Sequence, residues 1–153
     1  MLQGTIPFLS RRVHKLWIEG EPYHLTAIDD LESFLWVTLW AFLQRKDKEP
    51  MKQEKAWLDT FTSPNPGIAL IFKELFIVRP SSEWDILRME GEIEPNMLNL
   101  IESLCGIAHQ GSQFLNEIGL EKAASPESLA NKIWNKSFQQ YGAYLRVMYE
   151  WLH

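Results

Sequence analysis

The most hydrophobic stretch of the chain is the ten-residue run FLWVTLWAFL, residues 34–43, in which Thr38 is the only polar residue. Upstream of it, Thr26 lies three residues before Asp29, the spacing of a capping box that satisfies free backbone N–H groups at a helix start. We therefore predict a helix over 26–46. A helix that is apolar on nearly every side belongs in a core or a membrane, and a bilayer needs about 20 apolar residues. This helix is expected to be buried inside the protein.

The other apolar residues also recur at helical intervals, between segments rich in Gly, Pro and polar residues. The run IALIFKELFIV, residues 68–78, fits a strand or a helix by periodicity. We predict a helix, because the run is longer than a normal strand and follows the turn SPNPG. The predicted helices cover residues 10–19, 26–46, 52–61, 68–78, 81–90, 94–117 and 125–152. No stretch shows convincing strand alternation, so the sequence predicts an all-α helical bundle.

The last predicted helix carries a long apolar stripe. Its members are Leu129, Ile133, Trp134, Phe138, Tyr141, Leu145, Met148, Tyr149 and Leu152. We interpret this stripe as a face that packs into the core. The alternative is an aromatic binding face formed by Trp134, Tyr141, Tyr144, Tyr149 and Trp151.

Composition adds limits to this picture. A chain of 153 residues with 46% hydrophobic and 23% charged residues is predicted to form a single helical domain over 1–153. The net charge of −5 argues against nucleic acid or an anionic membrane as the main partner. No signal peptide is visible, and a single cysteine excludes an internal disulfide. We expect an intracellular protein, cytoplasmic or nuclear.

Candidate chemistry is sparse. The four histidines are scattered without metal-ligand spacing, and no serine lies in a nucleophile-elbow sequence. Cys105 lacks basic neighbours and is expected to be a buried, inert thiol. We therefore predict no metal and no cofactor.

Two motifs resemble a protein kinase at the spacing that they have here. GTIPFLS, residues 4–10, resembles the end of an activation segment, and DDLESFLWVTLW, residues 29–40, resembles the F helix that follows it. The pair is most similar to the fungal-type protein kinase family, whose members carry a GT-x-PF-x-S segment and then a DDLES-type helix. The casein kinase group has a similar DDLES opening. The resemblance implies a bundle like the lower part of a kinase C-lobe, from the end of the activation segment onward.

The first motif implies a substrate loop. By resemblance, Gly4, Thr5 and Pro7 would belong to the loop that receives the residue after a substrate's phosphorylation site. An ordinary turn is the alternative for Gly4 and Thr5. Arg12 stands where kinases usually carry the glutamate of their APE motif. In kinases this glutamate is the acidic member of an ion pair that stabilises the C-lobe. With Arg12 at that position, the same ion pair cannot form with its usual acidic and basic members.

The second motif implies structural residues. By resemblance, Asp30 would be the buried F-helix aspartate that holds the backbone of the catalytic loop, with Ser33, Trp36 and Trp40 as further structural positions of that helix. The alternative is that Asp29 and Asp30 are acids that interact favourably with the helix dipole.

The groups that phosphoryl transfer needs are missing from the sequence. It contains no G-x-G-x-x-G loop, no V-A-I-K lysine, no HRD and no DFG motif. We therefore expect the chain not to be an enzyme on its own.

The segments that cover a kinase F helix would precede the residues present here. Leaving its Phe, Trp and Leu side chains exposed would cost about 1.5 to 3 kcal/mol each. A repacked C-terminal helix, a second copy of the chain or a protein partner is expected to cover them. Without the usual backbone donors, Asp30 is expected to be exposed or to pair with Arg11, Arg12 or His24.

The preferred interpretation is a non-catalytic protein-binding or dimerising module that resembles a truncated fungal-type kinase C-lobe, as a pseudokinase-like remnant. Its partner would be a protein or a second copy that covers the F-helix face. One alternative is a fragment of a longer active serine/threonine kinase whose catalytic half is missing. The other is a helical interaction protein unrelated to kinases.

Overall fold

The computed structural model describes residues 6–45, 47–119 and 125–153, and all regular structure in this part of the chain is helical. A 3-10 helix, η1 (Ile6–Phe8), precedes the α-helices. These are α1 (Arg11–Glu19), α2 (Ala27–Leu43), α3 (Lys52–Phe61), α4 (Pro66–Ile77), α5 (Ser81–Glu90), α6 (Pro95–Gly119) and α7 (Pro126–Leu152). The prediction of an all-α protein is confirmed, and so is the choice of a helix for the run 68–78.

Polar side chains fix several helix starts. Thr26 and Asp29 form the predicted capping box, in which each side chain accepts from the backbone N–H of the other residue. Ser10 caps α1, Asn65 caps α4 and Ser125 caps α7, each by accepting a backbone N–H of the first turn. These capping residues can be recognised in the sequence, which explains why the predicted helix boundaries lie close to the observed ones.

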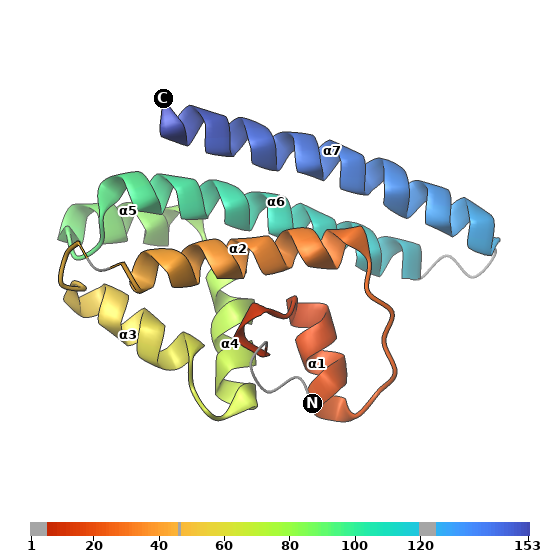
Figure 1. Ribbon diagram of the computed structural model, residues 1–153, viewed down its shortest axis with the longest axis horizontal. Coiled ribbons are helices and arrows are strands. Elements are labelled where there is room, and N and C mark those ends of the chain that lie inside the picture. Colours follow the sequence, from red (N-terminus) through yellow and green to blue (C-terminus); the bar gives the residue numbers. More distant parts are fainter. Residues whose placement is uncertain (1–5, 46, 120–124) are drawn as a thin grey trace.

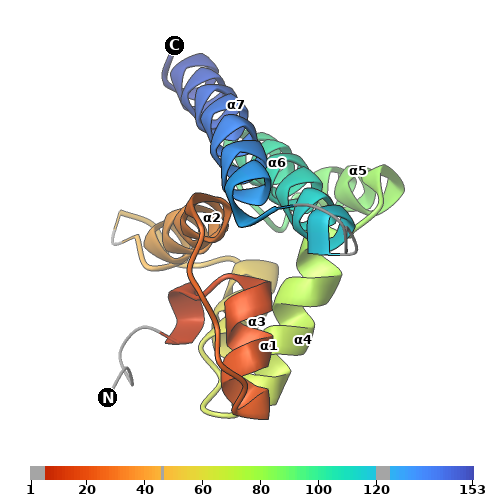
Figure 2. The ribbon, with the colours of Figure 1, turned by 90° about the vertical axis from the view of Figure 1, so that its right-hand side faces the viewer.

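The helices form two groups around α2. On one side α6 and α7 lie along each other and both contact α2, so that the three helices make a bundle (Figure 1). On the other side lie α1, α3 and α4, with α1 and α4 side by side when the molecule is seen end-on (Figure 2). The helix that carries the DDLES motif is therefore the central helix of the fold.

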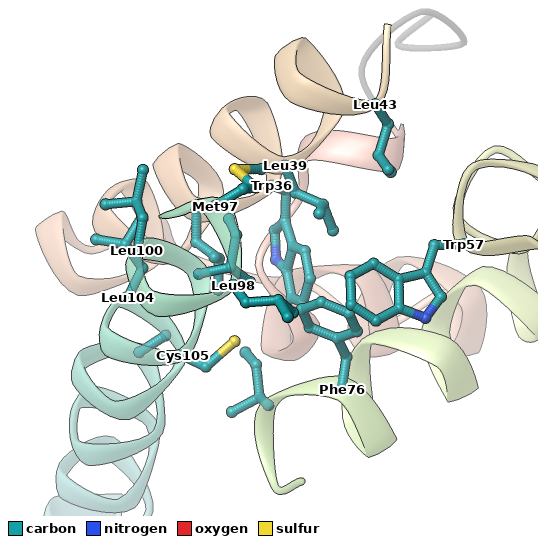
Figure 3. Packing of buried hydrophobic residues seen from close by; sticks show 14 of the residues in the cluster. Trp36, Leu39, Leu43, Trp57, Phe76, Met97, Leu98, Leu100, Leu104 and Cys105 are labelled. Carbon is teal, nitrogen blue, oxygen red and sulfur yellow. The ribbon is translucent and has the colours of Figure 1, made fainter. Parts of the chain in front are cut away.

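One hydrophobic cluster connects α2 with every helix that follows it. Trp36 of α2 is fully buried against Phe61 and Phe76, and the Trp57 ring meets Phe76 edge-on with 4.8 Å between ring centroids. Figure 3 shows Trp36, Trp57 and Phe76 of this group together with Leu98 of α6. The predicted burial of the hydrophobic run is confirmed for the face of α2 that points into this cluster.

The outer face of α2 departs from the prediction. Phe34, Val37 and Trp40 are exposed, so the expectation of a helix buried on nearly every side is wrong for these positions. The reason is geometric: the residues of α2 that belong to the hydrophobic cluster, such as Leu35 and Leu39, face the other helices of the core, whereas among the described residues the outer face at Trp40 meets a short segment, with Phe8 of η1 beside it.

The orientation of α7 also differs from the prediction. Its buried residues are Ser137, Gln140 and Tyr144, whereas most of the stripe predicted to pack into the core is exposed. The Gln140 amide donates a 2.8 Å hydrogen bond to the carbonyl of Ile107 in α6, which satisfies a polar group at the helix contact. The exposed stripe members are Trp134, Phe138, Tyr141, Leu145, Tyr149 and Leu152.

Candidate functional site

The residues assigned by the kinase resemblance lie in different environments. Gly4 and Thr5 fall outside the described residues, and Pro7 is half-buried in η1. Ser33 is half-buried on α2, and Trp40 is exposed with its ring edge-on to Phe8 at 5.7 Å. Among the described residues, Pro7, Ser33 and Trp40 line no common pocket.

The predicted role of Asp30 as a buried carboxylate does not agree with its position. Asp30 is exposed, which is one of the two alternatives given for it. The buried acids of this helix are its neighbours Asp29 and Glu32. Arg11 and Arg12, which were candidate partners of Asp30, pair with these two residues instead.

Arg12 and Asp29 tie the start of α1 to the start of α2. Arg12 Nη2 lies 2.5 Å from Asp29 Oδ2 and also donates to the backbone carbonyl of His24. The Ser10 and Thr26 hydroxyls donate to the same carboxylate. Burial alone would raise the pKa of Asp29, but these hydrogen bonds and the Arg12 charge together hold that pKa below its usual value.

Glu32, one turn further along α2, forms a second connection between α1 and α2. Its Oε1 atom accepts hydrogen bonds from the Arg11 backbone N–H at 2.7 Å, the Arg11 Nε at 3.1 Å and the Trp36 indole at 3.3 Å. Both side chains of the ion pair are almost fully buried. A buried pair of this kind is costly to break, because the remaining charge would have no partner.

Lys73 of α4 extends the buried polar cluster. Its ammonium group donates to the carbonyl of Leu9 at 2.7 Å and lies 3.5 Å from His14 Nδ1. Burial lowers the pKa of Lys73 to about 7, with the Glu32 charge acting in the opposite direction. Burial and the Lys73 charge lower the pKa of His14 to about 4. This lowered pKa favours the neutral imidazole of His14 at pH 7.

The hydrogen bonds of this buried polar cluster connect helices to one another. The named hydrogen bonds of its charged side chains go to one another, to backbone groups or to the neutral side chains of Ser10, Thr26 and Trp36. They join the segment before α1, and α1 itself, to α2 and α4. Cys105, which is buried as predicted, has its pKa raised by burial and is held as a thiol. No group of His, Cys, Asp and Glu within the described ranges is arranged to hold a metal ion.

The second candidate site is an apolar surface on α7 and the adjacent edge of α2, here called the α2–α7 surface. It consists of Phe34, Trp134, Phe138, Tyr141, Leu145, Tyr149 and Leu152. The Phe34 ring lies edge-on to Tyr144 with 6.0 Å between centroids, which joins the two helices. A groove lined by Ala27, Leu31, Trp134, Ser137, Phe138 and Tyr141 opens at one end of this surface.

A shorter apolar row lies on α4. Ile68, Ile71, Leu75 and Val78 are exposed at intervals of three and four residues. Grooves with α1 and with α3 flank this row. The row has four members, so it offers a smaller area than the α2–α7 surface.

The α7 residues of this surface were recognisable in sequence as an apolar stripe, which was predicted to pack into the core. A signal against that prediction was present: Tyr144 and Val147 extend the apolar residues of α7 beyond this stripe, so the apolar arc is too wide for one core contact. Lys73 was not predicted to have a role, although it interrupts the middle of the apolar run 68–78. A charge at that position signals a buried polar contact.

Within the part of the chain that the structure describes, no helix is long and apolar enough to cross a membrane. Comparisons of the chain with protein-family models, with curated proteins and with solved structures found no match. The kinase resemblance therefore rests on the two motifs alone.

Proposed function

We propose that the chain is a non-catalytic protein-binding module whose contact surface is the α2–α7 surface. The observation that carries this proposal is the exposure of seven large apolar side chains on one face, each between 45% and 71% exposed. Contiguous apolar patches of this kind are rare on monomeric soluble proteins and mark interaction sites. Aromatic residues, which make up five of the seven, are also enriched at protein interfaces.

The module resembles a truncated fungal-type kinase C-lobe, and two features support this part of the proposal. The DDLES helix is central to the fold, as an F-helix equivalent would be, and Trp36 is fully buried within it. Arg12, at the position of the APE glutamate, forms an ion pair of opposite polarity with Asp29. The expectation that a C-terminal helix helps to cover the DDLES helix is consistent with the contacts of α6 and α7 with α2.

The absence of catalysis is tested by thermal unfolding with and without ATP and magnesium. We expect the midpoint temperature to be unchanged, because the sequence lacks the phosphate, metal and base groups of a kinase. A magnesium-dependent rise would contradict the proposal and support the alternative of a kinase fragment.

Protein binding is tested by photo-crosslinking in cells that express the full chain. A photoreactive phenylalanine analogue replaces Phe138 on the α2–α7 surface or, as the matched control, exposed Gln139 on the polar side of the same helix. We expect a light-dependent adduct with one defined polypeptide from position 138 and none from position 139. The absence of any adduct from position 138 would contradict a protein-binding role for this surface.

A further inference from the structure

We propose that the partner of the α2–α7 surface is a second copy of this chain, with the two α7 helices packed antiparallel about a two-fold axis. This inference rests on the proposed function, because it assigns an occupant to the same surface. Three properties of the surface lead to it: its area, the spacing of its residues and its lack of charge.

The area matches the requirement of a stable dimer. With roughly 200 Å² for each large side chain, the exposed fractions of the seven members amount to about 800 Å². A standard protein interface buries about 800 Å² on each partner. The exposed row on α4 reaches about half of this area by the same measure, which is why α7 is the preferred contact.

The spacing of the α7 residues is compatible with two-fold symmetry. In an antiparallel pair centred at residue 143, position 134 faces position 152 and position 141 faces position 145 of the other copy. Phe138 then lies at the height of position 148, where the exposed side chain is the neighbouring Tyr149, because Met148 packs against the core of its own chain. A two-fold interface requires such reciprocal contacts, because the same patch is used by both copies. The pairs 134/152 and 141/145 each join an exposed aromatic side chain to an exposed leucine.

The surface carries no charge that a dimer would bury. Its seven members are all uncharged, and the charged residues Arg146 and Glu150 occupy other sides of α7. On α2, exposed Asp30 lies one turn before Phe34, at the edge of the surface, where its carboxylate can stay in water. A second copy would therefore cover the α2–α7 surface without the cost of desolvating an ion. The Tyr hydroxyls and the Trp134 indole can stay at the rim, where water satisfies them.

The test is light scattering coupled to size exclusion on the full chain, over a wide range of concentration. We expect a particle of twice the chain mass of 17.9 kDa. The double variant Phe138→Glu, Leu145→Glu should be a monomer with unchanged helicity, since both side chains are exposed in one copy. Gln139→Glu adds the same charge on the polar side of α7 and should leave the dimer intact.

The register is tested by mixing Tyr141→Cys chains with Leu145→Cys chains under oxidising conditions. A disulfide that links the two different chains is expected in the mixture, because these positions face each other across the axis. Gln139→Cys chains should not form it. The native Cys105 is buried and does not compete.

Failure of this inference can be separated from failure of the proposed function. A wild-type monomer at all concentrations would overturn the dimer, and an adduct from position 138 with a different polypeptide would then leave protein binding intact. Open polymers would overturn the two-fold arrangement, because they require contact between two different surfaces. A monomer that forms no adduct from position 138 would overturn both proposals.

Discussion

The acidic residues at the start of α2 have different roles, although they are close in sequence. Asp29 and Glu32 point into the contact with α1, where each meets an arginine, and Asp30 points to solvent. Neighbours on a helix differ by about 100° in direction, so one position decides whether a carboxylate is buried. The motif DDLES specifies the acids, and the packing of α1 decides which of them form buried ion pairs.

Glu32→Gln is expected to lower the free energy of unfolding by about 3 to 5 kcal/mol, because it leaves the Arg11 guanidinium buried without its counter-charge. Chemical denaturation monitored by circular dichroism measures the change. Asp30→Asn is the matched control on the same helix and should stay within about 0.5 kcal/mol of the wild type. Equal effects of the two substitutions would contradict the assignment of the buried carboxylate.

His14 is expected to make the protein sensitive to mild acid. Its pKa is about 4 in the folded chain against an ordinary value of 6.5, so between these values the unfolded chain binds a proton that the folded chain does not. The contribution of neutral His14 to the free energy of unfolding is complete above pH 6.5 and is lost as the pH falls to about 4. The loss is about 1 to 3 kcal/mol. Asp29, whose pKa is lowered from 3.8, contributes only at lower pH.

The measurement is the free energy of unfolding at several values between pH 4 and 6.5. His14→Met should flatten the dependence on pH in this window, because it removes the titrating group. His153→Gln, at the exposed end of the chain, should leave the dependence as it is in the wild type. An identical slope in all three proteins would show that His14 is not its source.

At the scale of the elements, the contact between α6 and α7 depends on a glycine. A Cβ atom at Gly111 would lie 2.7 Å from the Gln140 side chain and 2.8 Å from Ile28 Cγ2, closer than real side chains approach. Gly111 therefore permits the approach of α7 and α2 to α6.

Gly111→Ala is expected to destabilise the protein by about 1 to 3 kcal/mol through overpacking, despite the better helix propensity of alanine. Gly142→Ala is the control, because a Cβ there meets nothing within 4 Å. It should stabilise the protein by about 0.5 to 1 kcal/mol. Thermal unfolding of the two variants gives the sign of each effect, and stabilisation by Gly111→Ala would contradict the close contact.

At the scale of the whole molecule, a single hydrophobic cluster spans α2 to α7. Helices that share one core are expected to unfold together, so the described chain should show one cooperative transition. Far-UV circular dichroism follows all the helices, and fluorescence reports the environments of the seven tryptophans, which include buried Trp36, Trp57 and Trp84 in the core. The two curves are expected to coincide. A fluorescence change that precedes loss of helix would contradict a single cooperative transition.

Much of the fold could be predicted from sequence because its signals are local. Capping residues, prolines and turn sequences place the helix ends, and the apolar periodicity identifies the helices between them. The all-α class and the burial of Trp36 and Cys105 follow from such signals. The candidate surface was only half predictable: its α7 residues were recognisable as an apolar stripe, but not as an exposed one.

The sequence by itself determined where the helices begin and end, and it showed that the motifs needed for phosphoryl transfer are missing. Both depend on residues near one another along the chain. The tertiary structure decided which face of α7 is buried, which acids of α2 form ion pairs and that Lys73 meets Leu9. These outcomes depend on contacts between distant segments, such as Gln140 with Ile107 beside Gly111. A helix with apolar residues over a wide arc can bury more than one face, and only its neighbours decide which face is left to bind.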